Sequence, residues 1–158
     1  MEKQTSSYTY FHICSNGIIT ERGLKADEAG IFDPDDITKL LGIEPFSKWK
    51  KGDAKPNAQN CPNIRPYNFS GWSAEKSTVG GLDIGEQCIE TIQNLKAKIS
   101  ELLEIKSLYD VSFWLVIVPH IYNEQAPAVS FGKDIIEFCY LTGTEIDVDI
   151  YVYQNFIE

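Results

Sequence analysis

Near the end of the chain lies its clearest pattern, a strict alternation of apolar and polar residues from Glu145 to Tyr153. Successive side chains of a β-strand point to opposite faces, so a period of two predicts a strand with one face in a core and the other in solvent. We expect a core face of Ile146, Val148, Ile150 and Val152, and a solvent face of Glu145, Asp147, Asp149, Tyr151 and Tyr153. Such a strand needs a sheet that is covered on one side.

Three other segments have the features of amphipathic helices. The strongest begins after Asp83, a good N-cap residue, and carries one apolar stripe at spacings of three and four residues, formed by Cys88, Ile92, Leu95, Ile99 and Leu102. A shorter helix is expected to begin at Asp33-Pro34 and to end at Gly42. The third is expected from Lys133 to Leu141, with Gly143 as its stop.

Segments rich in β-branched and aromatic residues predict strands over 8–15, around Trp49, and over 67–76, 110–119, 126–131 and 145–153. The resulting order, β-α-β-β-α-β-β-α-β, predicts an α+β fold with an antiparallel or mixed sheet and helices on one side. The stretches 31–43 and 130–146 echo each other, which allows for a duplicated strand and helix unit.

Length and composition limit the class of protein further. A chain of 158 residues with 43% apolar residues suits a single globular domain over 1–158, in which we expect residues 1–7 to be a disordered N-terminus. The four cysteines are scattered without a CxxC pair, as expected for reduced thiols. We find no signal-like segment at the start and no apolar run long enough for a bilayer, and therefore expect a cytoplasmic protein.

Two motifs identify a resemblance to a known family. The first is Phe32-Asp33-Pro34 with Leu40-Leu41-Gly42-Ile43-Glu44-Pro45, followed by Trp49-Lys50-Lys51-Gly52-Asp53; the second is the closing segment from Gly143 to Tyr151. With Trp72 and the long helix between them, they resemble the bacterial family called domain of unknown function 4279. The resemblance implies the fold and carries no catalytic residue. Small acidic proteins of such families resemble immunity proteins encoded beside bacterial toxins.

The sequence contains no recognisable catalytic constellation. A serine or cysteine nucleophile needs a nearby base, and the only histidines, His12 and His120, lie outside known catalytic motifs. Cysteines and histidines are too scattered for a zinc site. We therefore predict no enzyme activity, no catalytic residues, no metal and no cofactor, although Asp147 and Asp149 leave open a metal-assisted hydrolase.

The formal charge of −9 disfavours nucleic acid and anionic membranes and favours a basic protein partner. Tyrosines beside carboxylates suit such a partner, because rings supply contact area and charges steer the encounter. We predict that Glu145, Asp147, Asp149, Tyr151 and Tyr153 bind a cognate toxin domain, as in an immunity protein. The alternative is a regulatory domain that binds a small molecule or an anion within segment 47–76, through Trp49, Lys51, Asp53, Arg65 and Trp72.

Overall fold

The computed structural model describes residues 3–20, 23–26, 30–61, 63–123 and 125–153. The chain divides into two compact units. The first unit comprises Met1–Phe11, Glu75–Ile99 and Phe113–Glu158, and the second comprises His12–Ala74 and Ser100–Ser112. Two strands, β1 (Ser6–Ser15) and β6 (Val111–Tyr122), contribute residues to both units.

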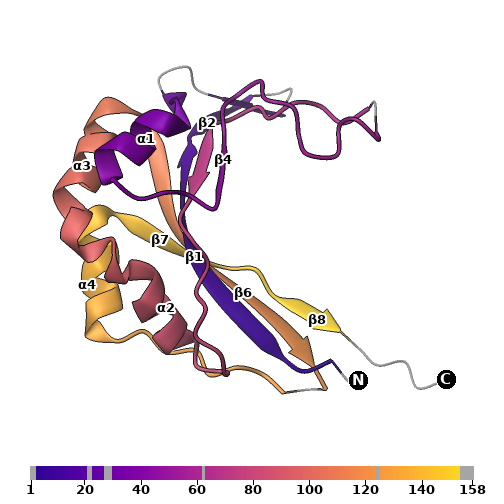
Figure 1. Ribbon diagram of the computed structural model, residues 1–158, viewed down its shortest axis with the longest axis vertical. Coiled ribbons are helices and arrows are strands. Elements are labelled where there is room, and N and C mark those ends of the chain that lie inside the picture. Colours follow the sequence, from indigo (N-terminus) through magenta and orange to yellow (C-terminus); the bar gives the residue numbers. More distant parts are fainter. Residues whose placement is uncertain (1–2, 21–22, 27–29, 62, 124, 154–158) are drawn as a thin grey trace. The chain divides into compact units, whose positions relative to one another are not determined.

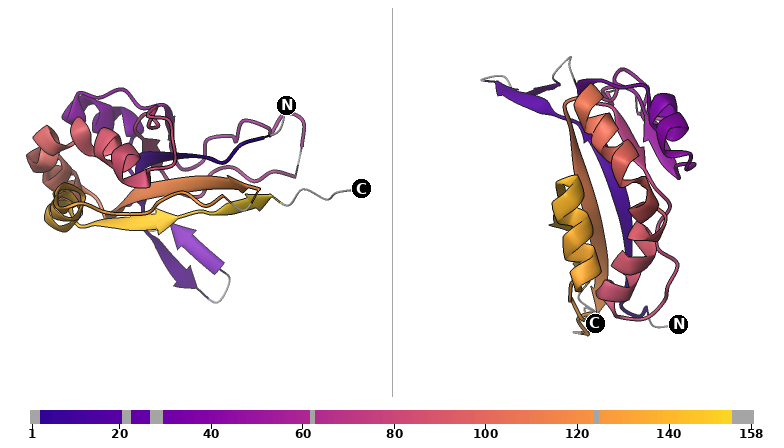
Figure 2. Two further views of the ribbon diagram at one scale, coloured as in Figure 1. Left: turned by 90° about the horizontal axis from the view of Figure 1, so that it is seen from below. Right: turned by 90° about the vertical axis from the view of Figure 1, so that its left-hand side faces the viewer.

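In the first unit, helices cover one face of the strands. The helices are α2 (Ile84–Gln93), the 3₁₀ turn η2 (Lys96–Lys98) and α4 (Lys133–Thr142), and Figure 2 shows α2 and α4 lying over the strands. The Thr9 hydroxyl of β1 donates to the Gln87 carbonyl of α2 at 2.9 Å. The Phe11 ring packs edge-on against Phe138 of α4, with centroids 6.0 Å apart. Alternate β1 residues therefore form the core of this unit.

The final strand is divided in two, β7 (Thr144–Val148) and β8 (Tyr151–Tyr153), and both pair parallel to β6 (Figure 1). The two strands share one register, with Val148 opposite Ile117 and Tyr151 opposite His120. Asp149 N donates to the Ile117 carbonyl at 2.9 Å, and the next ladder bond would need an N–H from residue 119. That residue is a proline, which has no N–H, so the ladder is interrupted there.

The second unit contains α1 (Pro34–Leu41), β4 (Ser47–Trp49), β5 (Gly71–Ser73) and most of α3 (Ile99–Leu108), with a hairpin of β2 (Gly17–Thr20) and β3 (Gly23–Ala26). The caps of α1 are those predicted: the Asp33 side chain accepts from Asp35 N, and Gly42 ends the helix with a φ of 64°. Trp72 of β5 is fully buried and its indole N–H donates to Thr38 of α1 at 3.1 Å.

The predicted α+β class and mixed sheet are confirmed. The main sheet has the order β4-β5-β1-β6-β7, with β8 also paired to β6; β4, β5 and β1 pair antiparallel, whereas β7 and β8 pair parallel to β6. The capped starts at Asp33 and Asp83 and the glycine stops at Gly42 and Gly143 are confirmed as well.

Several expected elements differ from the structure. The expected strand over 126–131 is reduced to an isolated bridge between Ala128 and Asp83. The long helix breaks at Asn94, a weak helix former, passes through η2 and continues to Leu108. The hairpin over 17–26 was not expected, and the strand expected over 67–76 is only Gly71–Ser73.

Two further differences concern the ends of the chain. Strand β1 begins at Ser6, and the Thr5 hydroxyl donates to the Tyr122 carbonyl at 2.9 Å, so residues 5–7 are bonded to the sheet, while residues 1–2 lie outside the described residues. The expected core face of the last strand is wrong, because Ile146, Val148, Ile150 and Val152 are exposed. They lie on β7 and β8, which pair only with β6 among the described strands and so stand at the edge of the sheet.

The echo between 31–43 and 130–146 extends through the helices and stops at their ends. Both α1 and α4 finish at a glycine in the left-handed conformation, Gly42 and Gly143. After Gly143 the chain enters the parallel strand β7 directly, whereas after Gly42 a loop leads to β4, which pairs antiparallel with β5.

Candidate functional site

The strand register of the first unit places the acidic residues and tyrosines of the last strands on one face. Glu145 lies opposite Trp114, Asp147 opposite Val116, Tyr151 opposite His120 and Tyr153 opposite Tyr122. Paired residues of neighbouring strands point to the same side of a sheet, and these β6 positions alternate with the core residues Phe113, Leu115 and Ile117. The face is therefore the one opposite the helices.

Four further rings join the predicted residues on this face, and none of the four was predicted. We call the whole set the aromatic-acidic face: Tyr8, Tyr10, His120, Tyr122, Glu145, Asp147, Asp149, Tyr151 and Tyr153. The sequence signal for the additional rings is the alternation of Tyr8 and Tyr10 with Thr9 and Phe11. This alternation does not predict that Tyr8 and Tyr10 share a face with Tyr151 and Tyr153, because only the strand order shows which strands are neighbours.

The rings of the aromatic-acidic face stack on one another. The His120 ring stacks nearly parallel on two tyrosine rings, with its centroid 5.1 Å from Tyr151 and 5.8 Å from Tyr153, each at an interplanar angle of 11°. Tyr153 stacks in turn on Tyr122 at 4.4 Å, and Tyr8 stacks on His120 at 6.1 Å. This stacking restricts the motion of the rings and pre-orders them.

Hydrogen bonds fix the polar groups of the face. The Tyr151 hydroxyl donates to Asp149 Oδ2 at 2.8 Å, and this bond is the main cause that raises the pKa of Tyr151. His120 Nδ1 lies 3.1 Å from the Tyr153 hydroxyl. Burial raises the pKa of Tyr10, and Tyr8 and the carboxylates of Asp149 and Asp147 raise it further. The negative field of the two aspartates therefore reaches Tyr10 of β1.

The face already accommodates one cation of the chain itself. Lys76 Nζ lies 4.2 Å from the centroid of the Tyr8 ring, within the range of a cation–π contact. Tyr151 and Tyr153 are 43% and 39% exposed, so their rings are accessible to solvent. Accessible electron-rich rings beside carboxylates are the groups that bind lysine and arginine side chains.

The alternative ligand residues of the second unit are not brought together. Trp49 pairs with Gly71 and Lys48 with Trp72, so the two tryptophans point to opposite faces of the sheet. Trp72 is buried beneath α1, and Trp49 stacks on Tyr67 at 4.7 Å. A single ligand would therefore not contact both rings.

Two polar residues of that alternative make local contacts to the backbone or from it. Asp53 Oδ2 accepts from Lys50 N at 2.7 Å and closes a turn, while the backbone N–H of Lys51 donates to Ser70 Oγ. Arg65 is exposed in the loop between β4 and β5.

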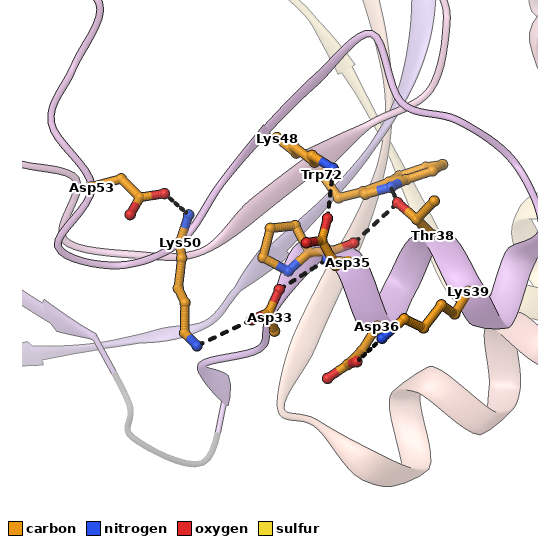
Figure 3. Close-up of polar contacts among 10 residues, drawn as sticks. Asp33, Asp35, Asp36, Thr38, Lys39, Lys48, Lys50, Asp53 and Trp72 are labelled. Atoms are coloured by element: carbon orange, nitrogen blue, oxygen red, sulfur yellow. Dashed lines mark hydrogen bonds and ion pairs between the residues drawn. The ribbon is translucent and has the colours of Figure 1, made fainter.

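Carboxylates at the start of α1 also lower the positive charge of this segment. Figure 3 shows Lys48 paired with Asp35, and Lys50 paired with Asp33 at 3.4 Å. The same acidic residues begin α1, where the helix dipole favours negative charge. Lys48 and Lys50 are thus partly neutralised by α1 and its N-cap.

His12 has a structural environment. Its Nδ1 lies 2.8 Å from Ser73 Oγ, but Ser73 is buried, so a substrate has no access to that hydroxyl. Burial lowers the pKa of His12 to about 4, so the imidazole is neutral at physiological pH. Its ring lies 5.6 Å from Trp49.

The described part of the chain also bears on metal sites, membrane spans and reactive cysteines. Among those residues, no three His, Cys, Asp or Glu side chains converge as metal ligands would, and each helix is too short or too polar to cross a bilayer. The four cysteines, all in the described part of the chain, form no disulfide, and burial raises the pKa of Cys88 to about 12.

A family model described as domain of unknown function (DUF4279) matches residues 5–153. The chain belongs to this family. The DUF4279 match covers every helix and strand described above, from β1 to β8, and confirms the resemblance read from the motifs at 32–53 and 143–151. Among curated proteins and among solved structures, no match to this DUF4279 chain was found.

Proposed function

We propose that this DUF4279 domain is a non-catalytic protein-binding domain whose aromatic-acidic face binds a basic surface of its partner. One observation carries the proposal: stacked, accessible rings and three carboxylates occupy one sheet face, and Lys76 already lies over one of the rings. A lysine or arginine of the partner would make the same contact with Tyr151 or Tyr153 and pair with Asp147 or Asp149.

The partner class that we propose is a bacterial toxin domain, so that the protein acts as an immunity protein in the cytoplasm. The net charge of −9 supports this choice, because a negative protein attracts a basic partner over a distance. Free thiols fit a reducing compartment. Within the proposal, the rings serve as anchors and the carboxylates provide orientation and a fast encounter.

Co-purification with the product of the neighbouring gene tests the proposal. We expect a complex, and we expect the double variant Asp147→Asn/Asp149→Asn to weaken it by about tenfold or more, since each removed charge faces the partner. Glu44→Gln/Glu104→Gln makes the same change of charge on exposed residues of the second unit and should bind like the wild type. If the wild type forms no complex and does not protect cells, the proposal is wrong.

The small-molecule alternative receives less support from the geometry, because its tryptophans lie on opposite sheet faces. A thermal-shift screen with metabolites distinguishes it from protein binding. A ligand that stabilises the protein, with the shift lost in Lys51→Ala, would favour that alternative.

A further inference from the structure

The strand β7 forms a free edge of the sheet. In the described part of the chain, β7 pairs with β6 along one edge, and no strand pairs with the other edge of β7. Asp149 N donates to Ile117, so in this register the odd-numbered residues bond to β6. The backbone N–H and C=O groups of Ile146 and Val148 therefore point outward, to the free side.

The side of β7 and β8 that faces the helices is apolar and exposed. Exposure is 36% for Ile146, 40% for Val148, 56% for Ile150 and 65% for Val152. The neighbouring helix α4 exposes Ile136 and Tyr140, of which Tyr140 is 85% exposed. These side chains are large, and solvent exposure of so many apolar groups in one region is typical of an interaction surface.

The exposed apolar side chains of α4 lie on the side of the helix that faces away from the sheet. Asp134 of α4 pairs with Lys96 at 2.6 Å, which identifies the side of α4 that faces the α2–η2 segment. Ile136 and Tyr140 lie about 200° and 240° further around the helix, at 100° per residue. The buried residues Ile135 and Phe138 lie about 100° and 40° around the helix from Asp134, so Ile136 and Tyr140 point away from the sheet, and Ile146 and Val148 form the apolar surface at the free edge.

We propose that β7 is the docking strand for an extended segment of the partner, which adds to the sheet as a further strand. This inference rests on the proposed function and specifies how the basic partner binds. The added strand would bond to the outward N–H and C=O groups of Ile146 and Val148. Its alternate side chains would pack on the apolar surface beside α4, and the others would lie beside Glu145 and Asp147. The segment that fits alternates apolar and basic residues.

A second copy of the chain is a poor occupant of this edge. An antiparallel pair of β7 strands centred on Ile146 would place Glu145 of each copy opposite Asp147 of the other. Centred on Asp147, the pair would place Asp147 opposite itself and Glu145 opposite Asp149. Like charges directly opposite each other destabilise a strand pair, so the acidic residues protect the edge against self-association and favour a basic strand.

A synthetic peptide of four Lys-Val repeats with blocked ends is the probe for this inference. We expect calorimetry to show binding to the wild-type protein, and hydrogen exchange to show that the amides of Ile146 and Val148 become protected. Val148→Pro removes one outward N–H and leaves the bonds to β6, since proline is compatible with an edge strand whose N–H faces solvent. We expect it to weaken peptide binding by about tenfold or more, while Val148→Ala stays within about threefold.

The outcomes separate this inference from the proposed function. If the wild type does not bind the peptide, if a Glu-Val peptide binds equally well, or if the two amides stay unprotected, the edge inference is overturned. If the neighbouring gene product binds Val148→Pro as tightly as the wild type but loses Asp147→Asn/Asp149→Asn, the edge inference fails and the proposed function stands. Thermal unfolding of Val148→Pro checks that this variant is folded. If it is unfolded, the hydrogen-exchange protection of the Ile146 and Val148 amides in the wild type tests the edge inference instead.

Discussion

The hydroxyl of Tyr151 donates a hydrogen bond to Asp149 Oδ2 at 2.8 Å, which couples an aromatic ring of β8 to a carboxylate at the break between β7 and β8. Pro119 on the neighbouring strand creates that break, because it cannot donate to the carbonyl of Asp149. Ring and charge are thus held together at the centre of the aromatic-acidic face.

Substitutions of Tyr151 separate the contribution of the ring from that of the hydroxyl. If the ring is an anchor for the partner, Tyr151→Phe should keep affinity within about threefold, whereas Tyr151→Ala should lose about tenfold or more. Calorimetric titration with the partner measures both. Equal losses for the two variants would show that the hydroxyl and not the ring matters.

Salt should weaken the complex mainly through the rate of association. The screening length falls from about 10 Å at 0.1 M to about 3 Å at 1 M salt, so long-range attraction to the acidic face is lost first. Stopped-flow measurements should show association slowing by about tenfold or more over this range, with little change in dissociation. An association rate independent of salt would contradict electrostatic steering.

Acid should destabilise the protein through His12. Burial lowers its pKa from 6.5 to about 4, so between these values the unfolded state binds more protons than the folded state. The contribution of His12 is therefore fully present above pH 6.5 and is lost as the pH falls toward 4, up to about 3 kcal/mol. Urea unfolding of the wild type and of His12→Gln across this range checks this, and parallel pH profiles of the two proteins would refute it.

Gly71 should not tolerate a side chain. A Cβ atom on Gly71 would lie 2.3 Å from the ring of Trp49, which would have to leave its stacked position on Tyr67. We expect Gly71→Ala to lower the free energy of unfolding by about 1–3 kcal/mol, as for overpacking. Chemical denaturation measures the loss.

Trp49→Ala provides the control for that substitution. Once the ring is absent, Gly71→Ala should cost much less, because the clash is with Trp49 alone among the nearest atoms. A cost that is unchanged in the Trp49→Ala background would mean that Gly71 is required for another reason.

Helix ends were predictable because their causes are local. Asp33, Asp83, Gly42 and Gly143 act within a few residues of their own positions, through a cap bond or a left-handed φ. The strand over 126–131 was predicted wrongly, because composition indicates a tendency to extend but does not provide a hydrogen-bonding neighbour.

The candidate site was predictable in part for the same reason. Alternation alone placed Glu145, Asp147, Tyr151 and Tyr153 on one face, since successive side chains of a strand point to opposite faces. Tyr8, Tyr10, His120 and Tyr122 lie far from them in sequence, and only the pairing of β6 with β8 and the stacking of Tyr8 on His120 bring them to the same face.

The sequence by itself determined where helices begin and end, which residues of a strand share a face, and the family to which the chain belongs. Only the tertiary structure decided that the last strand lies at a free edge, and that its apolar residues are exposed while tyrosines from other strands gather on its polar side. The physical reason is that periodicity depends on the geometry of one segment. Burial and neighbours depend on strand order, which is set by contacts between residues distant in sequence.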